Sequence, residues 1–307
     1  MKRRSFVKTL STIGLGAVVV PSLSSFSSKK KSVKLTILHT NDTHSNIDPF
    51  PENHPKFPGQ GGVSKRATLI NKIRSEEEHV LLLDAGDIFQ GTPYFNKFKG
   101  ELEMKLMTQL GYEVATLGNH DFDIGIEGYM KAKALSDFQV VNANYSFGTS
   151  ALADLVKKSI IIKKGKLRIG IFGVGIDLKG LVAEKNFAGV VYTDPISAAQ
   201  KEVDELKKKK CDLIICLSHL GYDFPSDPNK VSDLKLAQQT SGIDLIIGGH
   251  THTFLDKVTE ILNKEGKTVR INQVGYGGLQ LGRIDFDFSA NDVKLASQQV
   301  ISVSDKV

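Results

Sequence analysis

The sequence predicts a mixed α/β domain with additional antiparallel strands near its carboxyl end. Short apolar runs, typical of buried strands, alternate with segments of helical periodicity through most of the chain. Beyond residue 256 the helical segments give way to strand-like runs separated by turn residues. The composition is that of a globular protein, because 40% of the 307 residues are hydrophobic and 24% are charged.

The expected elements follow from the apolar periodicity and the turn residues. Strands of the α/β part are expected at Val33–His39, Val80–Asp84, Glu113–Leu117, Phe138–Asn142, Leu167–Val174, Asp212–Ser218 and Asp244–Gly248. Helices are expected at Gly62–Glu78, Leu102–Leu110, Ile126–Ser136, Pro195–Lys209 and Val231–Thr240. The additional strands are expected at Asp256–Leu262, Thr268–Val274, Gln280–Phe288 and Val293–Ile301, with a turn at Asn263–Gly266. The Pro- and Gly-rich segment Ile47–Gly62 is expected to be a long loop.

Residues 1–28 are expected to be an export signal in front of one catalytic domain, residues 29–307. The stretch Lys2–Lys8 is basic and contains a twin arginine, and the modestly apolar stretch Thr9–Val20 follows it. This arrangement resembles a twin-arginine signal, which implies export of the folded protein to the periplasm. A disordered basic tail and an ordinary secretion signal are the alternatives.

The net charge of +6 does not indicate a nucleic-acid partner. Four of the positive charges lie in the first 28 residues, and no RNA- or DNA-binding signature follows. No apolar run reaches the roughly 18 residues of a membrane-spanning helix, so no stable membrane span is expected. Cys211 and Cys216 lie at the two ends of one apolar run. In a strand their side chains would face opposite ways as buried apolar residues and could not form a disulfide.

Five apolar runs each end in side chains that can bind a metal ion. The motifs at their ends are Asp42-Thr43-His44, Gly86-Asp87, Gly118-Asn119-His120-Asp121, His219 and Gly249-His250-Thr251-His252. Parallel strands place their carboxyl ends along one edge of an open α/β sheet, where the loops meet in a common crevice. A lone histidine after a strand is more often a structural residue. The repetition of the pattern at the same end of each run nevertheless predicts a metal centre.

The types of side chain restrict the metal and its chemistry. Imidazole together with carboxylate suits zinc, manganese, iron or nickel rather than calcium. His250 and His252 are separated by one residue, and in a turn that splays their side chains they would reach two neighbouring ions. Asp87 is the natural bridge between those ions. Two ions about 3.5–4 Å apart can share a bridging hydroxide and act on both ends of an in-line displacement at phosphorus.

This series of motifs resembles the calcineurin-like metallophosphoesterases over roughly residues 33–290, and more narrowly their 5′-nucleotidase branch. The resemblance implies a four-layer α/β/β/α sandwich and two divalent ions, such as Mn, Zn or Fe. It implies cleavage of a nucleotide or related small phosphate ester by a metal-bridged hydroxide. One ion would be held by Asp42, His44, Asp87 and His252, and the other by Asp87, Asn119, His219 and His250.

The resemblance implies a different role for His120 and Asp123. His120, with Asn119, would contact the scissile phosphate, and His120 would protonate the leaving oxygen while Asp123 orients its imidazole. A carboxylate partner fixes the tautomer of an imidazole and raises its basicity, which agrees with this role. The alternative for Asp123 is a cap at the start of the following helix. Of the other histidines, His54 and His79 are expected to be exposed, and His39 is expected to be buried or to contact a ligand.

The substrate is left open by the sequence. Secreted 5′-nucleotidases usually carry a second, C-terminal domain that holds the base and the phosphate, and no room is expected for it before Val307. We therefore expect either a standalone phosphatase, with a pocket shaped by Ile47–Gly62 and Gly175–Thr193, or a catalytic half that pairs with a separately encoded substrate domain. A cyclic-nucleotide phosphodiesterase, a thiosulfate-ester hydrolase and a non-catalytic metal-binding scaffold are further alternatives.

Overall fold

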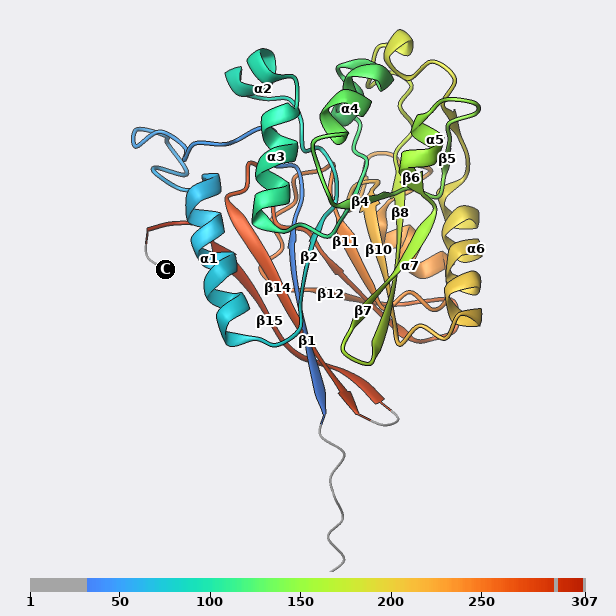
Figure 1. The fold of residues 1–307 in the computed structure, drawn as a ribbon. Coiled ribbons are helices and arrows are strands. Elements are labelled where there is room, and N and C mark those ends of the chain that lie inside the picture. Colours follow the sequence, from blue (N-terminus) through green and yellow to red (C-terminus); the bar gives the residue numbers. More distant parts are fainter. Residues whose placement is uncertain (1–31, 290–291, 306–307) are drawn as a thin grey trace, which may run out of the picture. The chain divides into compact units, whose positions relative to one another are not determined.

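The computed structural model describes residues 32–289 and 292–305 (Figure 1). The expected signal, residues 1–28, lies outside the described residues. Two β-sheets pack against each other in the described part, and helices cover their outer faces. This is the four-layer α/β/β/α arrangement that the resemblance implied. No helix in these two ranges has the length and apolar character needed to cross a membrane.

The first sheet contains seven strands in the order β15-β14-β1-β2-β3-β4-β6. Its strands are β1 (Val33–Thr40), β2 (Val80–Asp84), β3 (Val114–Thr116), β4 (Gln139–Val141), β6 (Val156–Lys157), β14 (Gln280–Ser289) and β15 (Asp292–Ser302). The strands from β1 to β6 are parallel, whereas β14 and β15 form an antiparallel extension beside β1. The carboxyl ends of β1, β2 and β3 therefore lie at one edge of this sheet.

The second sheet contains six strands in the order β12-β13-β11-β10-β8-β7. Its strands are β7 (Ser159–Lys164), β8 (Leu167–Gly175), β10 (Leu213–His219), β11 (Leu245–Gly248), β12 (Thr259–Leu262) and β13 (Thr268–Asn272). The central strands β8, β10, β11 and β13 are parallel, and β7 and β12 are antiparallel edge strands. A separate pair, β5 (Tyr145–Ser146) and β9 (Val191–Tyr192), lies in the loops.

Helices pack on the outer face of each sheet. They are α1 (Val63–Glu76), α2 (Pro93–Phe98), α3 (Glu101–Leu110), α4 (Gly125–Lys133), α5 (Leu152–Leu155), α6 (Pro195–Lys208) and α7 (Asp233–Gln239), with 3₁₀ turns η1 (His120–Phe122) and η2 (Glu184–Phe187). Ile70 of α1 and Met104 of α3 share an apolar cluster with the first sheet, and Val203 of α6 packs on the second. Both faces of each sheet are thus covered, which explains why the central strands are apolar at consecutive positions.

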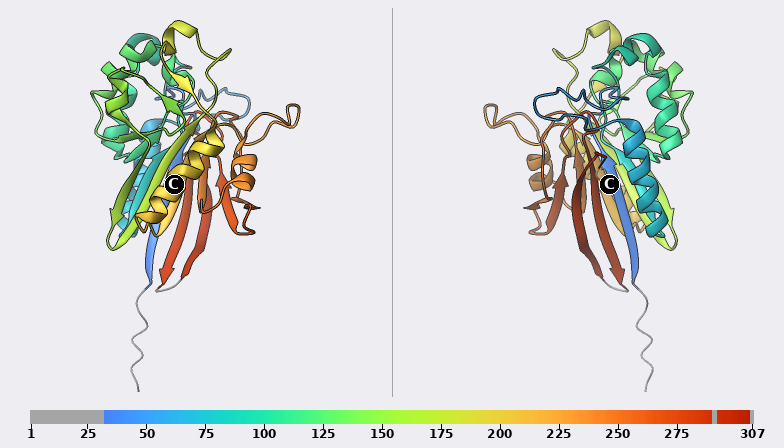
Figure 2. Two further views of the ribbon diagram at one scale, coloured as in Figure 1. Left: turned by 90° about the vertical axis from the view of Figure 1, so that its right-hand side faces the viewer. Right: turned by 90° about the vertical axis from the view of Figure 1, so that its left-hand side faces the viewer.

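A close approach of the two sheets brings their carboxyl ends together. The N–H of Ala143, just after β4, donates to the carbonyl oxygen of Gly173 in β8 at 2.8 Å. A Cβ atom at Gly173 would lie 2.2 Å from the carbonyl oxygen of Val141, so only glycine fits there. Both views of Figure 2 place the blue segment after β1 and the orange segment after β10 at the same end of the sheets.

Every strand and helix expected from the sequence is present. Val80–Asp84 has the expected bounds, and the other elements differ at one or both ends. The last helix shortens to α7, and β12 begins at Thr259 rather than at Asp256. The short elements α2, α5, β5, β6, β7 and β9 were not anticipated. The segment Ile47–Gly62 is a long loop, closed by a bridge between Pro49 and Gly61.

The expectation for the cysteines was only partly correct. Cys211 and Cys216 carry free thiols, as expected. However, Cys211 precedes β10 and is only half-buried, and both side chains pack against the same outer cluster rather than facing opposite ways. The alternation of a strand does not apply to a residue outside the strand.

Candidate metal centre

The loops after five strands meet at the carboxyl ends of the two sheets. The N–H groups of Asp42 and His44 donate to the carbonyl oxygens of Gly86 (2.9 Å) and Asp87 (3.1 Å), which joins the first two loops. From the second sheet, the N–H of His250 lies 3.0 Å from both carboxylate oxygens of Asp42. The five motifs therefore meet, although they lie on two packed sheets rather than along the edge of one.

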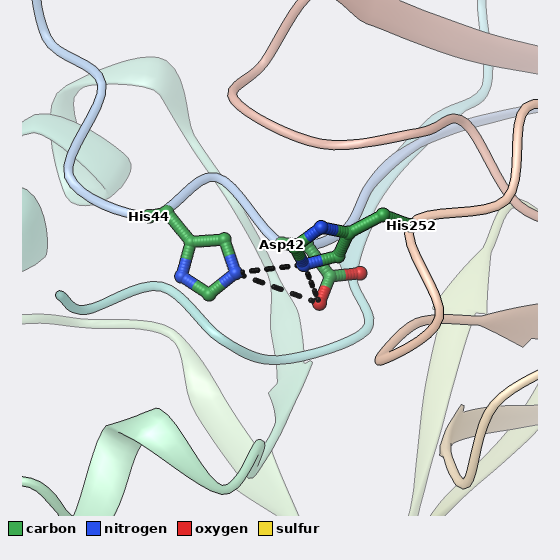
Figure 3. A group of neighbouring side chains, drawn as sticks. All are labelled: Asp42, His44 and His252. Atoms are coloured by element: carbon green, nitrogen blue, oxygen red, sulfur yellow. Dashed lines mark hydrogen bonds and ion pairs between the residues drawn. The ribbon is translucent and has the colours of Figure 1, made fainter. Parts of the chain in front are cut away.

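Asp42, His44 and His252 form the first group of potential metal ligands (Figure 3). The Nε2 atoms of His44 and His252 face each other at 3.0 Å. The Oδ1 atom of Asp42 lies 3.4 Å from Nε2 of His252 and 3.9 Å from Nε2 of His44. Two loops that are distant in the sequence thus direct three donor atoms toward one point.

Asp87, His219 and His250 form the second group. The Oδ2 atom of Asp87 lies 3.1 Å from Nε2 of His219. The side-chain oxygen of Asn119 lies 2.8 Å from Nδ1 of His250, so this amide joins the group. In each group of acidic and histidine ligands the donor atoms lie within 4.8 Å of one another.

Asp87 lies between the two groups. Its Oδ2 atom is 3.8 Å from Nε2 of His44 in the first group and 3.1 Å from Nε2 of His219 in the second. Its Oδ1 atom accepts a hydrogen bond from the N–H of His120 at 2.8 Å. Asp42 also spans the groups, because its Oδ1 atom is 3.9 Å from Nε2 of His219. The bridging position inferred for Asp87 is geometrically available, and Asp42 is a second carboxylate near both groups.

Backbone carbonyls orient two of the imidazoles. Nδ1 of His219 lies 2.7 Å from the carbonyl oxygen of Ala85, and Nδ1 of His44 lies 3.1 Å from that of Phe89. Because a carbonyl only accepts, Nδ1 of each ring carries a proton, and Nε2 is turned toward the centre. Nε2 of His219 is buried, makes no hydrogen bond, and faces the Asp87 carboxylate. Such an orphaned donor atom beside a carboxylate fits a divalent cation.

Burial and charge set the protonation of these groups. Burial disfavours the charged forms of Asp87 and His219, but their mutual attraction outweighs it: the pKa of Asp87 falls below its usual range and that of His219 rises. Burial lowers the pKa of His44, and burial together with the neighbouring His219 lowers that of His250 to about 4. His44 and His250 are therefore neutral near pH 7. A cation held by these residues would take the place of the proton on His219.

Five of the candidate ligands adopt a left-handed backbone conformation. Their φ angles are 49° at Asp42, 45° at His44, 57° at Asp87, 73° at His250 and 53° at His252. In the described residues these are more than half of the nine non-glycine residues with positive φ. Each such residue costs on the order of 1–3 kcal/mol, and the strain concentrates where function requires it. The loops are therefore held in one geometry by their surroundings.

Asn41, which sequence reasoning did not single out, positions Asp42. Its Nδ2 donates to Oδ2 of Asp42 at 2.6 Å and to the carbonyl oxygen of Gly275 at 2.7 Å, while its Oδ1 accepts from the N–H of Val274 at 2.9 Å. The available signal was its place directly before Asp42 in the first motif. The amide fixes the direction in which the carboxylate points.

Asp121 holds the loop that carries Asp87. Its buried carboxyl group accepts hydrogen bonds from the N–H groups of Asp87 (3.2 Å), Ile88 (3.0 Å), Phe89 (3.3 Å) and Gly118 (2.8 Å). Burial and the neighbouring Asp87 charge raise the pKa of Asp121 to about 7, and the N–H donors oppose this rise. A Cβ atom at Gly118 would lie 2.1 Å from Oδ1 of Asp87, so the loop also requires glycine there.

Replacement of Asp121 by asparagine is expected to lower the free energy of unfolding by about 2–3 kcal/mol, because the amide turns an N–H₂ group toward backbone donors. Urea denaturation of the metal-free protein measures this loss. Asp212→Asn is the matched control, since the exposed Asp212 carboxylate accepts from one backbone N–H, that of Arg168 (2.7 Å). Equal effects of the two substitutions would show that Asp121 does not hold the loop.

His120 and Asp123 stand beside the two groups. Nδ1 of His120 lies 2.8 Å from Oδ2 of Asp123, and this hydrogen bond raises the pKa of His120. The His120 ring is half-buried and lies edge-on to His44, with ring centres 5.4 Å apart. The cap alternative for Asp123 is wrong: Ile124 precedes helix α4, and no side chain caps that helix. Asp123 turns toward His120 instead.

The other histidines differ in part from expectation. His39 is buried, as expected, and its ring occupies the space over Gly282. His54 and His79 were expected to be exposed, but both are half-buried. His54 packs against Phe50, and the His79 ring covers Gly165. The apolar part of an imidazole favours such contacts with neighbouring rings and backbone.

Comparison with known proteins identifies similar chains. The calcineurin-like phosphoesterase family model matches residues 35–254. The trifunctional nucleotide phosphoesterase protein YfkN of Bacillus subtilis is 32% identical, over 88% of this chain and 19% of that protein. The 5′-nucleotidase of Bos taurus is 32% identical, over 92% of this chain and 51% of that protein. This chain spans about half the length of the 5′-nucleotidases that it matches.

Solved structures give the same result. The 5′-nucleotidase precursor of Thermus thermophilus superimposes with a TM-score of 0.77 at 32% identity, covering 88% of this chain and 54% of that one. The calcineurin-like phosphoesterase YfkN of Bacillus subtilis has a TM-score of 0.73 at 26% identity, covering 90% and 93%. The fold, the clustered ligands and the match over most of the sequence agree, and the chain belongs to the calcineurin-like phosphoesterase family.

Proposed function

We propose that this protein is a two-metal hydrolase of phosphate monoesters, with nucleotides and related small esters as substrates. The observation that carries the proposal is the pair of ligand groups with Asp87 between them. Two adjacent cations can act on both the attacking and the leaving oxygen of one phosphoryl group. The similarity to 5′-nucleotidases supports nucleotides as the substrate class.

The family depends on two metal ions, and the residues here fit such a pair. One ion would be held by Asp42, His44, Asp87 and His252, and the other by Asp87, Asn119, His219 and His250. Bound ions would supply the positive charge that activates water and neutralises the phosphate. The nitrogen and oxygen donors suit Mn, Zn or Fe.

The protein's own side chains then position the ester and handle the proton. Asn119 and His120 contact the phosphate, and the Nε2 atom of His120 donates a proton to the leaving oxygen. Asp123, 2.8 Å from Nδ1 of His120, fixes the ring orientation and stabilises the protonated imidazole. The hydrogen bond from His120 N–H to Asp87 links this acid to the bridging carboxylate.

A catalytic half that works with a separate substrate-binding domain is the second candidate. It is favoured by the coverage of the relatives, since this chain matches 51% of the bovine 5′-nucleotidase and 54% of the Thermus chain. A thiosulfate-ester hydrolase is less favoured, because the sulfate thiohydrolase SoxB of Thermus thermophilus shares 18% identity, which supports the fold alone. A cyclic phosphodiesterase and a non-catalytic scaffold have no specific observation in their favour.

The protein loaded with Mn or Zn is expected to hydrolyse p-nitrophenyl phosphate, and EDTA is expected to abolish the activity. Release of p-nitrophenol measures the reaction, and a screen of nucleotides, cyclic nucleotides and UDP-sugars then ranks the substrates. Restoration of activity by added metal controls for denaturation by the chelator. No turnover of any ester by monodisperse, metal-loaded protein would contradict the enzymatic proposal.

Export remains part of the proposal. The twin-arginine-like segment, residues 1–28, would direct the folded domain, residues 29–307, to the periplasm. A fusion of residues 1–28 to a reporter that is active only after folded export, together with a twin-lysine variant of Arg3 and Arg4, tests this route.

A further inference from the structure

A group of five aromatic rings lies beside the first ligand group. We call it the aromatic platform, and its members are Phe50, His54, Phe57, Phe254 and Tyr276. Three of the rings come from the loop Ile47–Gly62, one follows β11 and one follows β13. Ring contacts of 5.0–6.3 Å connect all five.

The platform contains a run of nearly parallel rings that ends at a partly exposed phenylalanine. Phe57 lies between His54 and Phe254, with centre distances of 5.6 and 5.8 Å and interplanar angles of 16° and 25°. Phe254 is the last ring of this stack and is 38% exposed. In the described structure no further parallel ring lies on Phe254. Because 38% of Phe254 is exposed, part of its ring leaves apolar surface against which one more planar ring could pack, beside the backbone of Gly275 that also lies on this ring.

Tyr276 connects the stack to the metal centre. Its ring stacks on His252 with centres 5.1 Å apart and an angle of 22°, and it meets Phe254 edge-on at 6.0 Å. Since His252 belongs to the first ligand group, two ring contacts separate the exposed ring from a candidate metal ligand. A group attached to a phosphate at the metal centre through a short linker lies within reach of this surface.

Two glycines allow the rings to pack this closely to the backbone. A Cβ atom at Gly275 would lie 2.2 Å from Cε1 of Phe254, and one at Gly277 would lie 2.9 Å from the ring of Phe50. The backbone after β13 is thus fitted to the rings from the other loops. The rings are held in place by these contacts rather than left free to rotate in solvent.

We infer that the aromatic platform binds the planar base of the substrate, with Phe254 as the stacking surface. This inference rests on the proposed function, because the phosphate of the same molecule must lie at the metal centre. Stacking on a fixed aromatic ring is tolerant of base identity, since every base offers a π-face. The preferred substrates are then nucleoside 5′-monophosphates of several bases rather than phosphate esters without a ring.

The test compares AMP with ribose 5-phosphate, which presents the same kind of primary phosphate ester without a base. For the unchanged, manganese-loaded protein, kcat/KM is expected to be at least about tenfold higher for AMP. Phe254→Leu, which keeps apolar area but removes the flat face, is expected to bring this ratio close to one. Phe57→Leu, which removes the ring beneath Phe254 and is farther from the metal ligands, is expected to lower the ratio less.

Phe98→Leu is the matched control. Phe98, at the end of α2, is 37% exposed and stacks on Tyr94 outside the platform, so its loss is expected to leave the ratio high. The inference is overturned if the unchanged protein shows nearly equal kcat/KM values for AMP and ribose 5-phosphate. It is also overturned if the Phe254→Leu variant keeps the high ratio of these values while its metal content is complete. If neither ester is hydrolysed, the proposed function fails. In that case calorimetry compares the dissociation constants of AMP and ribose 5-phosphate. Tighter binding of AMP that is lost in Phe254→Leu supports the platform, and equal binding of the two esters contradicts it.

Discussion

The variant His120→Asn is expected to hydrolyse a phosphate ester about 10²–10⁴ times more slowly than the unchanged protein while it still binds two divalent ions. The imidazole would supply the proton to the leaving oxygen, and an amide cannot replace it at neutral pH. Because the side chain of His120 bonds Asp123 rather than any candidate metal ligand, the ligand groups stay complete. Steady-state kinetics and metal analysis of the same sample measure both properties.

The control for this variant is His79→Asn. His79 is also a half-buried histidine, but it precedes β2, at the opposite end of that strand from Asp87, and it is expected to leave kcat within about twofold. Asp123→Asn should lower kcat less than His120→Asn, since the acid itself remains. Loss of metal from His120→Asn would show that His120 is a ligand and that its role as the acid is wrongly assigned.

The variant Asp87→Asn is expected to lose both metal and activity. The carboxylate lies 3.1 Å from His219 Nε2 and 3.8 Å from His44 Nε2, so its charge serves both ligand groups. Substitution of residues that merely orient ligands costs about 10–100-fold in metal affinity, and the bridge itself should cost more. Atomic emission analysis after dialysis is expected to find about one ion or none per chain, and hydrolysis should fall to background.

Asp48→Asn controls for the charge change, because Asp48 is an exposed carboxylate whose partner is the hydroxyl of Tyr94. It should keep two ions and full activity. Retention of both ions and normal hydrolysis by Asp87→Asn would contradict a bridging role. Retention of one ion with partial activity would place Asp87 in a single ligand group.

Much of the fold was predictable because the central strands are buried on both faces. Runs such as Leu81–Leu83 are uninterrupted by polar residues, and a terminal Asp, His or Gly marks where each run leaves the core. The ligand motifs occupy those ends, so strand direction predicted that they gather at one edge of a sheet. It did not predict that the edges of two sheets meet. Backbone hydrogen bonds between the loops of Asp42 and Asp87 show the same proximity in the structure.

The division of the strands between two sheets was not predictable from periodicity. Inner and outer positions both carry leucine, isoleucine or valine, so Leu81 in the space between the sheets and Leu82 beneath the helices look alike in sequence. Only the resemblance to a known family predicted the four-layer arrangement. The tight contact at Gly173 depends on atoms from β4 and β8, which no local pattern connects.

The residues that support the site were less predictable than its candidate ligands. Asp121 resembles another potential ligand in the sequence, but its oxygens are occupied by backbone N–H groups of the neighbouring loop. The aromatic platform joins residues about 200 positions apart, such as Phe57 and Phe254, which only the folded chain brings together. Exposure of His54 was wrongly expected because its ring packs on Phe50 and Phe57 of the same loop, and periodicity does not describe how a loop folds on itself.

Two metal ions are expected to lie side by side with Asp87 between them. Anomalous diffraction from crystals soaked in manganese tests this arrangement most directly. Two peaks are expected about 3.5–4 Å apart, one beside His44 and His252 and the other beside His219 and His250. A single peak at full occupancy, or two peaks that do not both contact Asp87, would contradict it.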